Sequence, residues 1–178
     1  MSAEKNQNKH SKFDNKCVIW HPVEMTWSAL KTPIARDGHG AVSFGNSMYI
    51  FGGNSEIGPL KDLWKFDFTK KIWIRLKDTP CSGRYSFSMH LWQEKFIALF
   101  GGCSAVTSPS KSERSNSMTV LKDLLLYDIA ENKWRILPCP EDGLWPEARY
   151  YFTLVQNLRW QKINFSSFVC ATWIYVPI

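Results

Sequence analysis

The side chains best suited to metal or redox chemistry lie scattered along this sequence. The four histidines are His10, His21, His39 and His90, and no two of them fall at the spacing of a metal-binding pair. The six tyrosines, at positions 49, 85, 127, 150, 151 and 175, could supply phenol ligands, but no histidine pair accompanies them. We therefore expect no metal and no other cofactor.

The cysteines indicate neither a disulfide framework nor a zinc site. They are Cys17, Cys81, Cys103, Cys139 and Cys170, an odd total without a C-x-x-C pair. Thiols this far apart in sequence are typical of reduced cysteines that serve as small apolar groups. We expect that role for all of them.

A glycine cluster near residue 40 raises the question of a phosphate-binding loop. Gly38, Gly40 and Gly45 lie close together, but Ser43 stands where a G-x-G-x-x-G motif needs its third glycine. No helical pattern follows the cluster, so the sequence offers no helix N-terminus for a phosphate. These glycines need a structural explanation instead.

The composition indicates a folded protein. Apolar residues make up 44% and aromatic residues 15% of the 178 positions, and the formal net charge is a modest +6 with its lysines and arginines scattered through turns. Residues 1–16 are polar and lack the apolar core of a signal peptide, and the apolar run 168–178 is too short to cross a bilayer. We expect a disordered tail over residues 1–16, a cytoplasmic location, and partners that are neither nucleic acid nor membrane.

The sequence contains an internal repeat. Seventeen residues lead from Arg36 to Gly53, nine more to Asp62, five to Asp67 and six to Trp73. The same order returns after Arg84, where it runs through Gly101, Gly102, Asp123, Asp128 and Trp134. The wording repeats as well, since YIFGG matches ALFGG and LKDLWKFDFTKKIW matches LKDLLLYDIAENKW. Two units are therefore present in phase.

Each unit has the pattern of four short strands. In the first unit, apolar or alternating runs cover residues 41–44, 48–51, 63–68 and 72–76, with turn residues between them. Such a meander cannot cover both of its faces alone, so it must stack on copies of itself. We predict an all-β fold, a partial β-propeller with about two complete four-stranded blades and parts of two more. The stretch 17–27 fits the outer strands of one partial blade, with His21 at the position of Asp67.

The repeat resembles the kelch repeat. The first unit carries Pro-x-x-Arg-x-x-His, a strand that ends in Gly-Gly, and Asp-Leu-Trp-x-Phe-Asp followed six residues later by Trp. This wording is similar to that of stand-alone kelch-domain proteins and leucine-zipper-like regulators, and the sequence contains no BTB-like segment. We expect kelch repeats over residues 17–157.

The repeated residues are expected to be structural. Glycines at the end of the second strand admit a close backbone approach. Asp62 and Asp123 are expected to accept turn amides, Trp73 and Trp134 to fill the gap between sheets, and the repeated arginines to tie blades together through carbonyl groups. The full set is Arg36, His39, Gly52, Gly53, Asp62, Asp67, Trp73, Arg84, Gly101, Gly102, Asp123, Asp128, Trp134 and Arg149.

Two loops are the predicted partner-binding segments. The second unit carries a serine-rich insert, residues 103–119, which we expect to be a solvated loop. The other segment is 54–59 in the first unit. The residues predicted to contact partners are Asn54, Glu56, Lys111 and Arg114.

The end of the sequence departs from the repeat. A third unit begins at Arg149, but counting onward from it places Ser166 and Ser167 at the glycine positions, and no aspartate–tryptophan frame follows. We expect residues 158–178 to be a divergent tail in a truncated product. A degenerate capping blade is the alternative.

The resemblance implies a non-enzymatic module that binds other proteins. In its full-length form, such a protein would be a substrate adaptor for a cullin-type ubiquitin ligase. The alternatives are a kelch-type metal-dependent oxidase or lyase, and an inactive truncated isoform. The sequence leaves the oligomeric state open.

Overall fold

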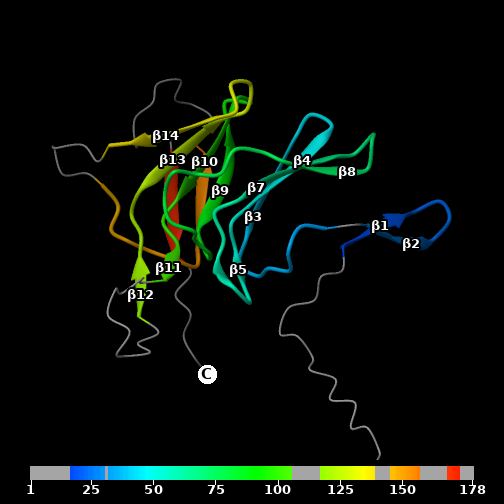
Figure 1. The fold of residues 1–178 in the computed structure, drawn as a ribbon. Helices are drawn as coiled ribbons and strands as arrows, with labels where there is room; N and C mark the ends of the chain where they lie inside the picture. The colour runs from blue at the N-terminus through cyan, green and yellow to red at the C-terminus, as the bar shows by residue number, and fades with distance from the viewer. Residues whose placement is uncertain (1–16, 31, 106–116, 139–144, 157–167, 173–178) are drawn as a thin grey trace, which may run out of the picture.

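The fold is built from β-strands (Figure 1). The computed structural model describes residues 17–30, 32–105, 117–138, 145–156 and 168–172. Within these ranges every regular element is a strand, and no helix there is long and apolar enough to cross a membrane. The predicted all-β class is confirmed.

The first blade is a four-stranded antiparallel sheet. Its strands follow one another in space as β3, β4, β7 and β8. They agree with the four predicted runs to within one residue at every end. A tight turn joins the first two strands, and Gly45 supplies its left-handed residue at φ 55. The bounds are β3 (Gly40–Phe44), β4 (Ser47–Phe51), β7 (Leu63–Asp67) and β8 (Ile72–Arg75).

The second blade repeats this order with different side chains. Its strands lie as β9, β10, β13 and β14, and each pairs antiparallel with the next. Both central strands, β10 and β13, are buried along their whole length. The bounds are β9 (Ser88–Trp92), β10 (Phe96–Phe100), β13 (Leu124–Asp128) and β14 (Lys133–Leu137).

A two-stranded hairpin stands at each end of the described chain. The first is β1 (Cys17–His21) with β2 (Thr26–Leu30), and the second is β15 (Phe152–Gln156) with β16 (Phe168–Thr172). The second hairpin differs from our expectation of a divergent tail after residue 157, because residues 168–172 form a strand beside β15.

The register of β16 also moves the glycine positions. Thr153 pairs with Ala171 as Ser88 pairs with Phe100, so the residue at the place of Gly101 is Thr172. Counting along the sequence had placed serines there. Both serines lie outside the described residues.

The blades are arranged around a common side formed by their first strands. Contacts join β3 to β9 and β9 to β15, and Figure 1 shows β3 and β9 side by side at the centre of the molecule. Successive blades that meet along their innermost strands make an arc of a propeller. The predicted partial β-propeller, with two complete blades and parts of two more, is confirmed.

The interior between the two blades is apolar. Buried side chains of both sheets pack against one another there, and this packing removes the apolar faces of the sheets from water. Burial raises the pKa of the Tyr127 phenol to about 12, and its hydroxyl donates to Asn132 Oδ1 at 2.7 Å. The buried members of this cluster are Tyr49, Phe51, Leu63, Phe87, Ile97, Leu99, Leu125 and Tyr127.

Candidate functional site

An arginine side chain links separate segments of the chain within each complete blade. Arg36 donates from both terminal nitrogens to the carboxylate of Asp62 at 2.8 Å, and Nη1 also donates to the Gly52 carbonyl at 2.9 Å. Arg84 makes the same contacts with Asp123, at 2.6 and 2.7 Å, and with the Gly101 carbonyl at 3.2 Å. Each guanidinium therefore fastens the third strand of its own blade to the end of the second.

The main chain of the same arginine ties its blade to the one before. Arg84 N donates to Leu60 O at 2.9 Å, and Gly53 N donates to Arg84 O at 2.8 Å. Arg149 repeats this arrangement with Leu121 and Gly102. We expected the arginines to tie blades together through carbonyl groups, and it is the backbone that makes those links.

Asp62 and Asp123 were expected to accept turn amides, and the structure pairs both of them with arginine. Turn amides are accepted by the second aspartate of each unit. Asp67 Oδ1 accepts from Thr69 N and Lys70 N at 2.9 Å, and Asp128 Oδ1 accepts from the equivalent amides at 3.1 Å. The hydrogen bond from the Lys70 amide is the main cause that holds the pKa of Asp67 below its ordinary value.

The pKa of Asp62 reflects opposing effects. Desolvation raises this pKa, but the hydrogen bonds from Arg36 and from the Trp64 indole together outweigh desolvation. The pKa of Asp62 is therefore below its ordinary value. The ionised form of Asp62 is therefore the one that the blade stabilises.

The paired glycines allow backbone segments to meet. Gly53 and Gly102 have φ of 98 and 93, in the region that favours glycine. A Cβ on Gly53 would lie 2.8 Å from the Asp37 carbonyl oxygen, and one on Gly102 would lie 2.8 Å from that of Tyr85. Each glycine thus leaves room for the segment that leads into the first strand of its blade. Any side chain at the glycine position would collide with that segment.

We expect Gly102→Ala to lower the free energy of unfolding by about 2 to 3 kcal/mol, because backbone strain adds to the collision. Gly45→Ala is the matched control. Gly45 also has a positive φ, but no atom lies within 4 Å of a Cβ there, so strain alone of about 1 kcal/mol applies. Urea denaturation measures both, and equal losses would contradict the close-approach explanation.

The two repeat tryptophans differ in their surroundings. Trp134 packs against Phe51 of the first blade and Tyr127 of its own, each at 5.1 Å between ring centres, and its indole nitrogen donates to Lys77 O at 2.8 Å. It fills the gap between the sheets as predicted. Trp73 packs on Phe66 at 5.0 Å, and its buried indole nitrogen has no hydrogen-bond partner.

His39 belongs to the blade and to no metal cluster in the described part of the chain. Its Cβ lies 3.0 Å from where a Cβ on Gly53 would stand. Desolvation and the charge of Arg36 lower its pKa, with Asp37 acting in the opposite direction. Among the described residues, no three histidine, cysteine or acidic side chains are grouped to hold a metal ion.

Two small hairpins carry the predicted binding loops. They are β5 (Asn54–Ser55) with β6 (Gly58–Pro59), and β11 (Cys103–Ala105) with β12 (Met118–Val120). Contacts join β6 to β11, and Figure 1 shows β5, β11 and β12 at the same end of the molecule. Both hairpins therefore belong to one face, which we call the loop face.

The residues predicted to bind partners have different fates on this face. Glu56 is exposed at the tip of its hairpin. Asn54 is half-buried, and its main chain forms two hydrogen bonds with Asp37, so it has a structural role. Lys111 and Arg114 lie outside the described residues. The ends of the insert were expected to be solvated, but Cys103 and Ser104 are buried.

Tyrosines that the sequence analysis considered only as metal ligands gather on the loop face. Tyr150 and Tyr151 are 42% and 67% exposed, with their ring centres 5.3 Å apart. The Tyr85 hydroxyl donates to Met118 Sδ at 3.4 Å. Burial is the main cause that raises the pKa of Tyr85, and Cys103, Tyr151 and Asp37 contribute through their charge interactions. We call Tyr85, Met118, Tyr150 and Tyr151 the tyrosine cluster.

A chain of main-chain hydrogen bonds holds this cluster in place. Ser86 N donates to Gly38 O at 2.8 Å, and Tyr151 N donates to Ser86 O at 3.0 Å. These residues occupy the same place in three successive blades, two positions after the repeated arginine, and each has a φ between 51 and 60. The sequence signal that could have revealed the cluster is the tyrosine that directly follows both Arg84 and Arg149.

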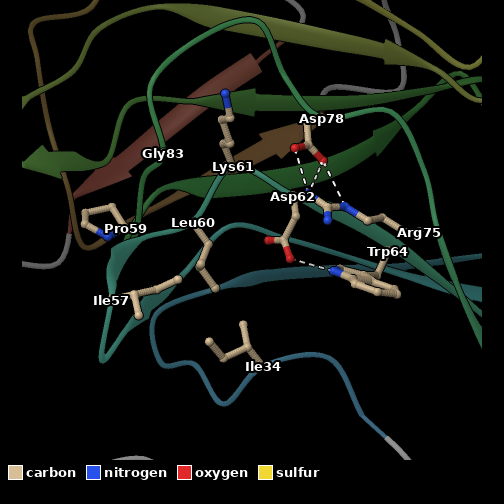
Figure 2. Close-up of a pocket in the computed structure, with 10 residues that line it drawn as sticks. All are labelled: Ile34, Ile57, Pro59, Leu60, Lys61, Asp62, Trp64, Arg75, Asp78 and Gly83. Carbon is tan, nitrogen blue, oxygen red and sulfur yellow. Dashed lines mark hydrogen bonds and ion pairs between the residues drawn. The ribbon is translucent and has the colours of Figure 1, made fainter.

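Figure 2 shows a separate pocket of about 430 Å³ beside the first blade. Two of its acidic groups have partners, since Asp78 pairs with Arg75, and Asp62 pairs with Arg36 and accepts from the Trp64 indole. Lys61 points away from these pairs (Figure 2). The other lining residues are Ile34, Ile57, Pro59, Leu60 and Gly83.

Comparison with known proteins identifies the repeat. The model of the KLHDC2/KLHL20/DRC7 Kelch-repeats domain matches residues 5–164. The chain belongs to the kelch-repeat family. This membership supports a protein-interaction module, which agrees with the coarse prediction from sequence.

Individual relatives carry different names. Kelch domain-containing protein 3 of Bos taurus is 31% identical over 121 residues, which cover 66% of this chain and 30% of the relative. The leucine-zipper-like transcriptional regulator 1 homolog of Drosophila melanogaster is 24% identical over 60% of this chain and 10% of the relative. The N-(sulfonatooxy)prop-2-enimidothioate sulfolyase of Thlaspi arvense is 24% identical over 87% of this chain and 43% of the relative. The kelch chain thus spans less than half the length of these relatives.

Proposed function

We propose that this kelch chain binds other proteins through the loop face, with the tyrosine cluster at the centre of the contact. The observation that carries the proposal is the gathering of Tyr85, Tyr150 and Tyr151 with Met118 on a face built by two hairpins. Tyrosine is enriched among the residues that dominate protein interfaces, because it combines a large apolar ring with a polar tip and few rotatable bonds.

The cellular role that we propose is substrate recognition for a cullin-type ubiquitin ligase by the full-length protein, in the cytoplasm. It rests on the resemblance to kelch adaptors and on the family membership. In this role, the loop face holds the substrate while other segments contact the ligase.

The test is a comparison of captured proteins between two double variants. In Tyr150→Ser/Tyr151→Ser, the second substitution preserves the fold because Ser86 already adopts the same backbone conformation. The matched control is Lys70→Ser/Glu131→Ser, on turns at the opposite ends of the strands. We expect specific partners to fall at least tenfold for the tyrosine variant alone, as measured by quantitative mass spectrometry. Equal capture by both variants would overturn the assignment.

A second candidate is a metal-dependent lyase, which the match to a sulfolyase over 87% of the chain favours. A lyase of this kind needs its metal for turnover. Adding divalent metals to the purified chain, and following cleavage of a sulfonated thioester-like substrate, tests it. Equal capture of partners by both double variants together with metal-dependent turnover would favour the lyase. Absence of both specific partners and turnover would favour an inactive truncated isoform.

A further inference from the structure

The hairpin β1–β2 is the outer half of a blade. His21 pairs with Thr26 across its turn, as Asp67 pairs with Ile72 and Asp128 with Lys133 in the complete blades. A tryptophan follows the pairing residue in all three cases. The strands β1 and β2 therefore correspond to β7 and β8, the third and fourth strands of a blade.

The hairpin β15–β16 is the inner half of a blade. Phe152 contacts the place of a Cβ on Gly101 at 3.2 Å, as Phe87 does on Gly52 at 3.1 Å. The strand β15 lies beside β9 as β9 lies beside β3. The strands β15 and β16 therefore correspond to β9 and β10, the first and second strands.

These two halves complement each other, and each has an open edge. In the described part of the chain, β16 has a strand neighbour on the β15 side alone, and β1 has one on the β2 side alone. An open strand edge presents a row of amide and carbonyl groups ready for another strand. Figure 1 shows β1–β2 (blue) on the side of the first blade that faces away from the second, which is the blade that β15 contacts.

Two side chains of β1 are more exposed than the residues at the same positions of a complete blade. Val18 and Trp20 are 47% and 43% exposed. At the same register of the second blade, Leu125 and Tyr127 are 0% and 1% exposed. A neighbouring strand and a neighbouring blade bury those positions in a complete blade.

A further observation concerns the tryptophan of the first blade. The Trp134 indole nitrogen donates to the carbonyl of Lys77, which comes two residues after β8 of the preceding blade. The corresponding nitrogen of Trp73 is buried without a partner. The residue at the place of Lys77, counted from β2, is Lys31, which lies outside the described residues. The first blade therefore keeps a buried, unpaired donor at the position where Trp134 binds the preceding outer hairpin.

We propose that β1–β2 of one copy of this chain pairs with β15–β16 of a second copy, so that two copies form one closed ring. Each copy contributes two complete blades and two complementary halves. The two junctions are identical, as a two-fold axis requires, and the ring has six blades, within the range of four to eight that propellers use. This assembly goes beyond the proposed binding function and does not depend on it.

The register of the shared blade follows from the complete ones. Phe100 pairs with Leu124 in the second blade, so Ala171 is predicted to face the partner copy's Cys17. In the second blade, Gly101 N donates to Asp123 O, so Gly101 and Asp123 form a hydrogen-bonded pair. The neighbouring pair, Phe100 and Leu124, is therefore of the non-hydrogen-bonded type. We expect the same type for Ala171 and Cys17, with Cα atoms about 4.5 Å apart. That separation is compatible with a disulfide.

The decisive experiment is Ala171→Cys in the full chain under an oxidant. We expect a disulfide-linked dimer on a non-reducing gel, lost when Cys17→Ser is added. The matched control is Val169→Cys, predicted to face Ile19 and to lie about 7 to 8 Å diagonally from Cys17, which is too far for a disulfide. Equal cross-linking of the two variants would overturn the predicted register.

Native mass provides a readout that does not depend on a cysteine variant. We expect the unmodified chain to have twice the 20.6 kDa of one copy, and Trp20→Asp to have the mass of one copy with the same far-ultraviolet circular dichroism. A monomeric unmodified chain, an assembly of three or more copies, or a dimer that survives Trp20→Asp would each overturn the proposal.

Discussion

Replacing Asp123 by alanine is expected to lower the free energy of unfolding by about 3 to 5 kcal/mol, because it leaves the Arg84 charge buried and unpaired. The Arg84 side chain is 1% exposed, and both oxygens of Asp123 accept its hydrogen bonds. In the unmodified chain these bonds stand in place of hydrogen bonds from the guanidinium to water. Urea denaturation of the unmodified and variant chains measures the loss.

The control for this prediction is another bidentate arginine–aspartate pair, in which the arginine donates from Nε and Nη2. Arg75 donates to both oxygens of Asp78, but the Arg75 side chain is 58% exposed. Asp78→Ala is expected to cost about 0 to 1 kcal/mol, as for other pairs in water. If the two variants lost the same stability, burial of Arg84 would not be the cause.

Replacing Trp134 by alanine is expected to cost about 3 to 5 kcal/mol, because the indole fills the space between the two blades. Its ring contacts Phe51 and Tyr127, which come from different sheets. Trp134 is half-buried, so its removal takes away both ring contacts and exposes the faces of Phe51 and Tyr127 that it covers. Thermal and urea unfolding, followed by circular dichroism, measure the loss.

Trp134→Phe separates packing from hydrogen bonding. Phenylalanine keeps most of the ring contact but removes the bond to the Lys77 carbonyl. We expect this variant to lose about 1 to 2 kcal/mol, since Lys77 is exposed and its carbonyl can bind water. A loss as large as that of the alanine variant would mean that the hydrogen bond, and not the packing, joins the blades.

The blades could be predicted from the sequence because the same sequence motifs occur twice with similar spacing. The pair Gly52 and Gly53 ends a strand in the sequence and in the structure, and the strand limits follow from it. The half-blade at the start was also predictable, since His21 stands the same distance before a tryptophan as Asp67 does. Local spacing was enough for these features.

The roles of the two aspartates could not be separated in the same way. Asp62 and Asp67 both flank a single strand, and a carboxylate near a turn can accept amides at either end. The choice depends on Arg36, which is 26 residues from Asp62 in sequence and meets it only when the sheet has formed. Spacing alone carries no information about such a pair.

The tyrosine cluster was missed because Tyr85 and Tyr150, which both directly follow a repeated arginine, were considered only as metal ligands. The position of Tyr151 is harder to recognise. Gly38, Ser86 and Tyr151 share a backbone conformation and a row of hydrogen bonds, but they share no side-chain chemistry. A search for similar residues overlooks them. The position becomes visible once the repeated arginines are aligned and the residues that follow are read as one ring.

The two attachments of Arg84, through its main chain and its side chain, favour folding of the blades in chain order. Its main chain binds Gly53 and Leu60, which precede it in the chain, and its side chain binds Asp123, which follows 39 residues later. During synthesis the earlier partners emerge from the ribosome first, so each finished blade is a template on which the next one starts. Unfolding that begins in one blade is, by the same links, transmitted to its neighbour.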